Sequence, residues 1–511
     1  MGQSEQPTRM DNPGGTKPSG NVPVYRLAKV LGVLALTSAA IANEYGATVN
    51  YASTNSLAVY PGAQDLVPLA MLLAGIVLLP KVVLYMRFST VMPRAGSFYV
   101  WIGRTLNLPI GFVASFLNWV ALAAGMGVVA FAFATFLSQG LVGAGITQGA
   151  ALITKPGHLI LGLAAIWIVY LVHMLGVKVY GGIVTVLFAL IALSALVIIG
   201  YGFLTSPEHF TQLADSASGL TLRAPTNPPP ADFASVLSVT ALLVAAYGGL
   251  NSATALGGEA RDASRTTPRG LLFGWLIALV LYSAVMFAIF HAAPWWAIVA
   301  LVHSNHAAAA TAPGLIGLVA PRAISVTLNL VVAVVVGKTL FPQMLVCSRS
   351  VFAWAEDHLV PEVFLQTTER KVPHAGLLLT ALLGSGFLIE STLIGWQIGF
   401  IIRSIAILLV LALVAAGTLH VRLNRRFHDV EWARAVSRGP WVMIAAVVAI
   451  IVAVVLVGGV LNVPKTPLVF QPWLQTLAAI ALGSIVYVIG AARAKRTGHD
   501  MAQVAAALPL E

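Results

Sequence analysis

The sequence contains few charged residues. Asp, Glu, Lys and Arg make up 9% of its 511 residues, whereas 58% are hydrophobic. Because soluble domains carry about 25% charged residues, this shortage excludes a soluble globular enzyme, a disordered protein and a fibrous protein. The apolar residues suffice for roughly twelve spans of about 20 residues each, and the 46 glycines are typical of membrane helices. The composition therefore predicts a polytopic membrane protein in a lipid bilayer.

Cysteine and catalytic signatures are also scarce. Cys347 is the single cysteine, so no intrachain disulfide can form, and its helical surroundings predict a packing role. The sequence contains no H-E-x-x-H, G-x-S-x-G or Walker A pattern, and its 11 histidines show no metal-ligand spacing. A P-loop at Gly337-Lys338-Thr339 would require glycine at position 332, which is Val332. We therefore expect neither an enzyme nor a bound metal or cofactor.

Twelve apolar runs predict twelve transmembrane helices, and an even number places both termini on the same side of the membrane. The predicted spans are 27–54, 66–87, 111–139, 157–175, 180–204, 233–258, 270–291, 318–354, 374–390, 396–420, 440–461 and 472–492. Residues 1–23 are polar and rich in Gly and Pro, which predicts a disordered tail. The apolar run behind this tail is too long for a signal peptide, so we expect the tail to be retained. Segment 205–232, with its Asn-Pro-Pro-Pro run, predicts an irregular loop.

The positions of the basic residues predict the orientation. Of the 29 Lys and Arg residues, four fall in loops assigned outside and two, Lys338 and Arg403, fall within spans. The remaining 23 lie in the tails and loops assigned inside, or at that boundary. By the positive-inside rule, both tails are predicted to be cytoplasmic and the protein to lie in the cell membrane. The net charge of +11 then marks loops beside anionic lipid and not a nucleic-acid partner.

Two predicted spans contain stretches that make poor continuous helices. Span 233–258 contains Gly248-Gly249 followed by polar residues, and span 27–54 contains Thr37-Ser38-Ala39. Broken helices are tolerated in hydrocarbon only around a cavity, and weak points at corresponding positions of two halves indicate a transporter binding site. Freed amides can hold a carboxylate and freed carbonyls an ammonium group, which suits a zwitterionic amino acid. The alternative is that the glycines only permit tight helix packing.

Three motifs carry a family resemblance. Residues 92–101 are similar to a P-R-A-G-G-x-Y-x-W segment. Residues 247–252 are similar to an unwound helix six, and residues 258–269 are similar to its G-E-x-x-N-P-x-R-x-x-P-R end. Residues 348–361 are similar to S-R-x-x-x-A-x-A-x-D-G-x-x-P. With their order and spacing, the chain resembles the amino acid–polyamine–organocation superfamily of secondary transporters over roughly residues 25–490.

The resemblance implies an all-α LeuT-like fold with twelve transmembrane helices. Residues 24–204 and 233–420 would form two inverted repeats of five helices, joined by an extracellular loop at 205–232. A cytoplasmic loop at 421–439, two peripheral helices at 440–492 and a cytoplasmic tail at 493–511 would follow. Amino acids would bind at the unwound centres of helices one and six and cross by alternating access. The expected substrate-binding residues are Thr37, Ser38, Ala39, Tyr247, Gly248, Gly249, Asn251 and Ser252.

The sequence also departs from the family pattern. Asn251 stands where several members carry an acidic residue, which disfavours a cationic substrate. Ile191 stands where some members carry a lysine in helix five, so a mechanism that relies on that lysine is not available. Other small solutes (an amine, a nucleobase or potassium) and a channel or sensor remain alternatives, because a fold does not fix a substrate. The oligomeric state is left open.

Ionisable residues within membrane spans are functional candidates, because burying them is costly. We expect the Lys338 ammonium to occupy the place of a coupling cation and to serve proton coupling; the alternative is a structural lysine. Arg403 is expected to line the outer vestibule or to contact an anionic substrate group, and Glu44 could pair with either base. Four residues at predicted cytoplasmic helix ends would form an inner gate, or else anchor loops: Glu259, Arg265, Arg349 and Asp357.

Overall fold

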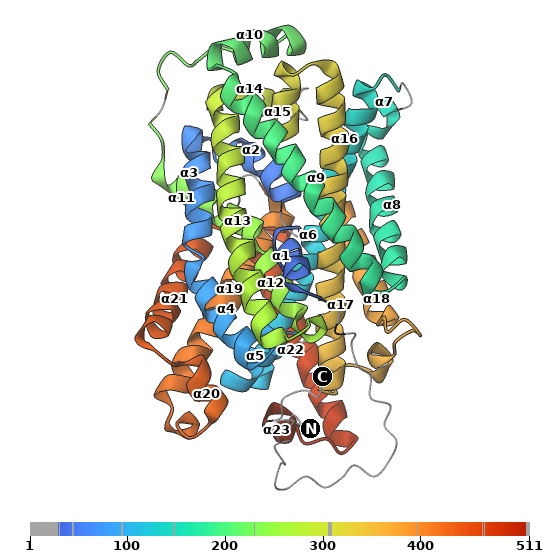
Figure 1. Cartoon of the computed structure of the whole chain (residues 1–511), viewed down its shortest axis with the longest axis vertical. Helices are drawn as coiled ribbons and strands as arrows, with labels where there is room; N and C mark the ends of the chain where they lie inside the picture. The colour runs from blue at the N-terminus through green and yellow to red at the C-terminus, as the bar shows by residue number, and fades with distance from the viewer. Residues whose placement is uncertain are drawn as a thin grey trace, which may run out of the picture.

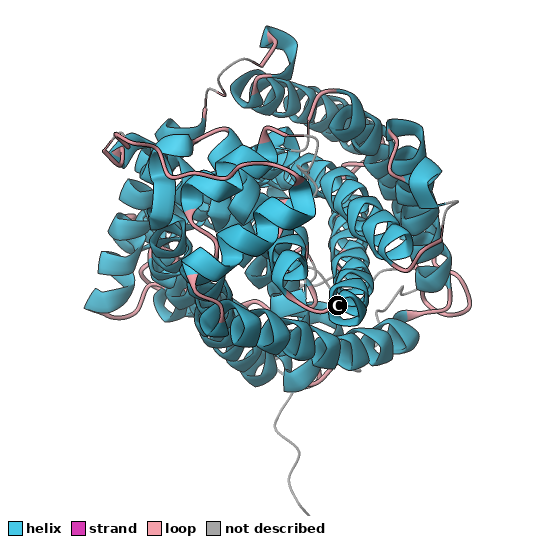
Figure 2. Ribbon diagram, turned by 90° about the horizontal axis from the view of Figure 1, so that it is seen from above, coloured by secondary structure: helices cyan, strands magenta, loops and turns pink. Residues whose placement is uncertain are grey.

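The computed structural model describes residues 29, 31–42, 45–93, 96–146, 149–228, 230–304, 309–395, 397–461, 463 and 466–506. Within these ranges every regular element is a helix, and the one β-type contact is an isolated parallel bridge between Leu31 and Ala260. The helices form an elongated bundle (Figure 1), and the view from above shows many of them tilted as they pack around one another (Figure 2). The predicted all-α polytopic fold is confirmed.

Eleven helical segments among the described residues are long and apolar enough to cross a membrane. They are η3–α3–α4 (Pro61–Val91), α6 (Leu108–Gly143), α8 (Lys155–Met174), α9 (Val177–Leu204), α11–α12 (Phe233–Ala255), α13 (Ala263–Ala292), α16–α17 (Arg322–Glu356), α18 (His374–Leu393), α19 (Gln397–Leu423), α21 (Pro440–Val460) and α22 (Pro472–Arg496). These segments correspond to the second to twelfth predicted spans. The described residues of the first predicted span, 27–54, form α1 (Val33–Ala42), a π-helical turn (Thr48–Ala52) and shorter turns up to Ala58, and none of these elements is of spanning length.

Helix α6 forms the centre of the bundle. It packs against α8, α16, α18, α19 and α22. It is apolar on all sides and mostly buried, as expected for a helix surrounded by other helices. Its start is fixed locally, because the Asn107 side chain accepts a hydrogen bond from the Ile110 backbone N–H at 2.9 Å and Pro109 occupies the first turn. This helix therefore offers side chains to many neighbours at once.

The sixth predicted span is interrupted where the double glycine lies. Helix α11 (Phe233–Leu243) ends in a 3₁₀ turn (Val244–Tyr247), and α12 (Gly249–Ala255) starts after Gly248. The eighth span is interrupted at Thr339, between α16 (Arg322–Lys338) and α17 (Leu340–Glu356). Glycine and backbone-bonding threonine weaken the regular hydrogen-bond pattern at these two places.

Short helices cover the two ends of the bundle. Helices α10 (Pro207–Ser218), α14 (Trp295–Val302) and α15 (Ala312–Val319) lie at one end, and α5 (Phe98–Thr105), α20 (Glu431–Val436) and α23 (Met501–Ala506) lie at the other (Figure 1). Helix α10 corrects the prediction of an irregular loop over 205–232. The Ser206 side chain caps its first turn, and Gly219 ends it with a left-handed φ of 68°, so the local sequence encodes a complete amphipathic helix.

Candidate functional site

The two helices predicted to be broken lie directly against each other. Helices α1 and α12 are in contact, and a Cβ atom at Gly249 would stand 1.8 Å from the Ala40 carbonyl oxygen. On α13, a Cβ at Gly274 would stand 2.5 Å from the Ala40 Cβ, and one at Gly270 would stand 2.7 Å from the Leu36 Cβ. Helix α1 therefore rests on a surface of glycines from α12 and α13, which is possible only because these residues lack side chains.

The predicted binding residues of α1 are buried at this contact, but they lie within the continuous helix Val33–Ala42 and not at a break, which corrects the prediction for this part of the first span. Thr37, Ser38 and Ala39 are all buried, and Ser38 Oγ has no hydrogen-bond partner among the residues described. The Tyr282 hydroxyl of α13 donates to the Ile41 carbonyl at 3.1 Å, close to the end of α1. Glu44 and Asn43 lie outside the described residues. The second half of α1 thus combines a satisfied carbonyl with a buried hydroxyl that retains its hydrogen-bonding capacity.

Tyr247 is held against α3 (Val67–Ile76). Its hydroxyl donates to the Met71 carbonyl at 3.1 Å, and its ring centroid lies 5.5 Å from that of Tyr282. A Cβ at Gly75 would stand 2.6 Å from the Tyr247 hydroxyl oxygen, so α3 leaves room for the tyrosine by having glycine there. Tyr247 consequently ties the interrupted sixth span to α3 and α13.

Four polar residues from four helices meet inside the bundle, and we call them the central polar cluster: Asn118, Asn251, Gln343 and Arg403. The Asn118 Oδ1 atom accepts hydrogen bonds from Asn251 Nδ2 at 3.4 Å and from Arg403 Nη1 at 3.2 Å. Gln343 and Arg403 both border Gly125, with side-chain atoms 3.8–3.9 Å from the position of a Cβ there. The cluster joins α6, α12, α17 and α19, and each of its members is at most 2% exposed.

Several atoms of the central polar cluster retain unused hydrogen-bonding capacity. Asn251 Oδ1, Asn118 Nδ2 and Gln343 Oε1 are buried and have no partner among the described part of the chain. Leaving a buried donor or acceptor unpaired costs about 1–3 kcal/mol, so native proteins keep few such groups without a reason. The cluster offers both acceptors and donors in a setting shielded from water. Its chemistry therefore suits a small molecule that carries groups of both kinds.

Lys338 lies at the junction of α16 and α17. Its side chain is 1% exposed, and its Nζ atom has no hydrogen-bond partner within the described residues. The Thr339 hydroxyl donates to the Val336 carbonyl at 2.8 Å, which tightens the backbone beside the lysine. A Cβ at Gly46 would stand 2.5 Å from Thr339 Cγ2, so the chain that follows α1 packs on this junction. The structure thus brings the Lys338 backbone next to the first broken span.

The four residues predicted to form an inner gate are divided among three places. The Arg349 guanidinium forms a buried ion pair with Glu259, in which Arg349 Nε donates to Glu259 Oε1 at 2.7 Å. Asp357 lies elsewhere and pairs with Arg104 at 3.5 Å, while it also accepts a hydrogen bond from the Tyr99 hydroxyl.

The fourth gate candidate differs in exposure. Arg265 pairs with Asp262 on the surface, where the two side chains are 77% and 60% exposed. The ion pairs Arg349–Glu259 and Arg104–Asp357 are therefore buried connections between helices, whereas Arg265–Asp262 is a local surface contact.

Backbone hydrogen bonds join the start of the first span to the end of the sixth beside this ion pair. The Leu31 N–H donates to the Glu259 carbonyl at 3.0 Å, and the Arg261 N–H donates to the Leu31 carbonyl at 2.8 Å. These two bonds form the parallel bridge between Leu31 and Ala260. Glu259 consequently connects three parts of the chain: its side chain contacts α17, and its backbone contacts the residues ahead of α1.

Sequence reasoning missed several residues that the structure brings into these sites. Asn118 and Gln343 belong to the central polar cluster, and Tyr99 and Arg104 contact Asp357. Asn118 and Gln343 are isolated polar residues in long apolar runs, and Arg104 is a cation at the end of the apolar helix α5. A polar or charged residue within an apolar run was the signal that could have found them, because a polar residue within a membrane span needs a partner.

Comparison with known proteins adds a family and two relatives. The family model for amino acid permeases matches residues 36–501. A branched-chain amino acid permease, BcaP of Lactococcus lactis subsp. cremoris, is 26% identical over 340 residues, which cover 62% of this chain and 66% of that protein. A serine/threonine exchanger, SteT of Bacillus subtilis, is 24% identical over 271 residues, which cover 52% of this chain and 55% of the exchanger. The matched part thus spans slightly less than two thirds of the permease and about half of the exchanger.

Proposed function

Because this chain belongs to the amino acid permease family, we propose that it carries amino acids across the cell membrane by alternating access. The two relatives are named for branched-chain amino acids and for serine and threonine, all of which have uncharged side chains. The same class suits this chain, because the polar group of α12 in the cluster is the neutral Asn251. Eleven apolar helical segments support the membrane setting.

The observation that carries this proposal is the central polar cluster, which includes residues of the interrupted sixth and eighth spans. Asn251 Oδ1 would accept a hydrogen bond from the substrate ammonium group, and Asn118 Nδ2 together with Arg403 would bind the carboxylate. The remaining predicted contacts come from the middle of α1, from the turn ahead of α12 and from the first residues of α12. They are Thr37, Ser38, Ala39, Tyr247, Gly248, Gly249 and Ser252. Because Gly249 and Ala40 lie in close contact, we propose that α1 and α12 separate when a substrate enters.

A ligand screen tests the substrate class. The purified full-length protein would be heated with neutral, acidic and basic amino acids, amines, nucleobases and potassium, and a ligand that binds the native state raises the melting temperature by mass action. We expect neutral amino acids to give the largest shifts and to be taken up by proteoliposomes. Stabilisation by nucleobases, amines or potassium alone would contradict the proposal.

For Lys338 we propose a role in proton coupling. Its buried ammonium group lies at the α16–α17 junction, on which the chain after α1 packs, so a change of its charge would affect the contact between these segments. Uptake by Lys338→Ala in proteoliposomes is expected to lose its response to a pH gradient. The exposed Lys155 offers a matched control, and Lys155→Ala should behave like the unchanged protein. Uptake by Lys338→Ala that still follows the pH gradient would remove this role.

For the buried ion pairs Arg349–Glu259 and Arg104–Asp357 we propose the role of an inner gate. Both pairs connect helices whose separation would open one end of the bundle. In a Cys347→Ser background, a cysteine at Ser38 should react with a membrane-impermeant reagent from the cytoplasmic side when Arg349→Ala is added. Equal protection of this cysteine with and without Arg349→Ala would favour fixed anchors over a gate.

We propose that both tails face the cytoplasm. Basic residues cluster around α20 and the last turn of α22, and α20 lies at the opposite end of the bundle from α10 (Figure 1). In the Cys347→Ser background, cysteine at the exposed Ser216 should react with an impermeant maleimide on intact cells. Cysteine at the exposed Arg438 should react only after the cells are permeabilised, and the reverse pattern would invert the orientation.

A further inference from the structure

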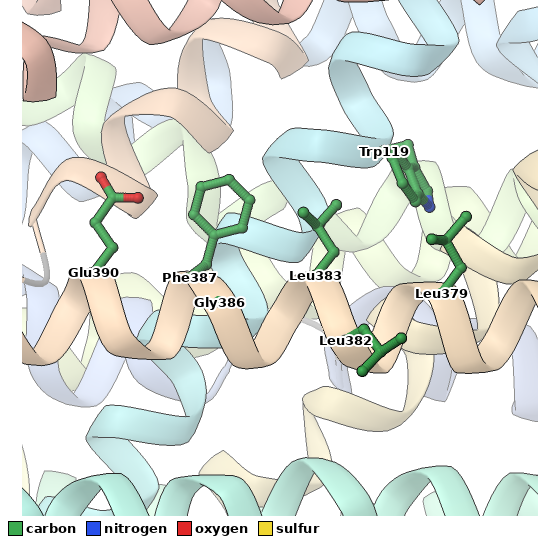
Figure 3. Close-up of a pocket in the computed structure, with 7 residues that line it drawn as sticks. All are labelled: Trp119, Leu379, Leu382, Leu383, Gly386, Phe387 and Glu390. Atoms are coloured by element: carbon green, nitrogen blue, oxygen red, sulfur yellow. The ribbon is translucent and has the colours of Figure 1, made fainter.

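A groove on the outer side of α18 lies apart from the sites described above. It has a volume of about 400 Å³ and is bordered by residues of α18 and by Trp119 of α6. Figure 3 shows Leu383, Phe387 and Glu390 on the same side of α18, with Trp119 facing this helix. Leu382, at the edge of the groove, is 54% exposed. Because α18 is a candidate membrane span, this exposed apolar edge would face the hydrocarbon of the bilayer.

Glu390 gives the apolar groove one charged end. Its Oε1 atom accepts a hydrogen bond from Gln475 Nε2 of α22 at 2.6 Å. No residue that the structure describes forms an ion pair with it. Phe387 and Glu390 also border a smaller crevice between α6, α18 and α19, so the carboxylate lies where two hollows meet. A carboxylate within a membrane span is costly, and a cationic ligand would offset that cost.

The length of the groove along α18 matches one leaflet of a membrane. From Leu379 to Glu390 the helix advances eleven residues, or about 16 Å. This is about half of a hydrocarbon core of roughly 30 Å. Glu390 lies three residues before the end of α18 at Leu393, and Gln475 lies in the first turn of α22. The charged end therefore lies near a membrane surface, and the apolar part extends toward the bilayer centre.

We propose that this groove binds a membrane lipid whose headgroup carries a primary ammonium group. The ammonium group would donate a hydrogen bond to the Glu390 carboxylate, and one acyl chain would lie along Phe387, Leu383 and Leu379. Opposite charge at the surface end and an apolar wall below it match the two parts of such a lipid. A quaternary ammonium headgroup has no N–H to donate, and an anionic headgroup would be repelled. This inference does not depend on which solute the protein transports.

Native mass spectrometry of the purified full-length protein tests the proposal. Phosphatidylethanolamine, phosphatidylcholine and phosphatidylglycerol with the same acyl chains would be titrated separately. Glu390→Gln removes the charge while keeping a similar shape, and Glu208→Gln, on the exposed first turn of α10, is the matched control. Gly386→Leu fills the groove, since a Cβ there meets no atom within 4 Å. Gly458→Leu of α21, with the same open surroundings, is its control.

We expect phosphatidylethanolamine to bind about tenfold more tightly than the other two lipids, as one charge-assisted hydrogen bond predicts. Glu390→Gln should abolish this preference, Gly386→Leu should weaken binding of all three lipids, and both controls should bind like the unchanged protein. Three results would each overturn the proposal. The first is equal affinity for the three lipids, and the second is a preference for phosphatidylethanolamine that survives Glu390→Gln. The third is that the unchanged protein is a dimer and Gly386→Leu dissociates it, which would assign the groove to a second copy of the chain.

Discussion

The buried ion pairs Arg349–Glu259 and Arg104–Asp357 can be compared with the central polar cluster. Both regions are buried in the same bundle, and both contain arginine. In the ion pairs each guanidinium faces a carboxylate, whereas the hydrogen bond from Arg403 goes to the neutral Asn118 carboxamide, and neighbouring amide atoms have no partner among the described residues. The first arrangement pairs opposite charges, although Glu259 Oε2 and Arg349 Nη1 have no hydrogen-bond partner among the described residues. The second pairs a cation with a neutral amide, and the proposed substrate recognition rests on the amide atoms that are left over.

The largest effect is expected from breaking the ion pair Arg349–Glu259. Arg349→Ala would leave a buried carboxylate without its cation, which typically costs about 3–5 kcal/mol of stability. The melting temperature of the purified protein should fall accordingly. Arg265→Ala removes a pair whose side chains are 77% and 60% exposed and should change stability by less than about 1 kcal/mol. A similar loss of stability in the two variants would show that the buried ion pair contributes no more than the surface pair.

A smaller but still large effect is expected at the contact of α1 and α12. Gly249→Ala would place a methyl group 1.8 Å from the Ala40 carbonyl oxygen and force the helices apart. Overpacking of this kind costs about 1–3 kcal/mol, and we expect uptake to be lost as well. Gly200→Ala in α9 meets no atom within 4 Å and serves as the control. A Gly249→Ala variant with normal melting temperature and uptake would contradict the close approach.

Asn251→Leu tests whether the central polar cluster recognises the substrate. It removes a buried amide whose Oδ1 has no described partner, so stability should change by less than about 1 kcal/mol, while uptake should fall by about tenfold or more. Asn107→Leu removes the cap of α6 and should show the opposite pattern, with about 1 kcal/mol less stability and normal uptake. Uptake by Asn251→Leu that equals the unchanged protein would exclude this residue from substrate recognition.

The smallest effect is expected from pH at the C-terminal segment. Burial lowers the pKa of His358, and the neighbouring His499 and Arg493 add to this, whereas Asp357 and Glu362 oppose it. The His358 and His499 ring centroids lie 3.6 Å apart. Because the folded state binds fewer protons, this contact is fully stable above the ordinary histidine pKa of about 6.5 and is lost as pH falls through the lower folded value.

Amide hydrogen exchange measures that change. Residues 493–506 should exchange faster at pH 5 than at pH 7, after correction for the intrinsic pH dependence of exchange. His358 has a left-handed φ of 57°, which asparagine also tolerates, so His358→Asn should remove the difference without distorting the backbone. An unchanged pH response in His358→Asn would assign the effect to other groups.

Much of the fold could be predicted from the sequence, and less of the site. Apolar runs predicted eleven segments that the structure confirms, because a membrane span depends on local length and hydropathy. The weakness around Gly248 and Gly249 marked a true interruption between α11 and α12. The helix α10 was missed, although its Ser206 cap and terminal Gly219 were visible, because Pro and polar residues suggested a loop.

The sequence by itself determined that this chain is an all-helical membrane protein with an interrupted sixth span. Only the tertiary structure decided which buried polar groups meet. Glu259 pairs with Arg349, 90 positions away, and Asn118 accepts a hydrogen bond from Arg403, 285 positions away. Hydropathy acts along a single helix and can be read locally, whereas a hydrogen bond requires two side chains within about 3 Å, which the packing of distant helices alone brings about.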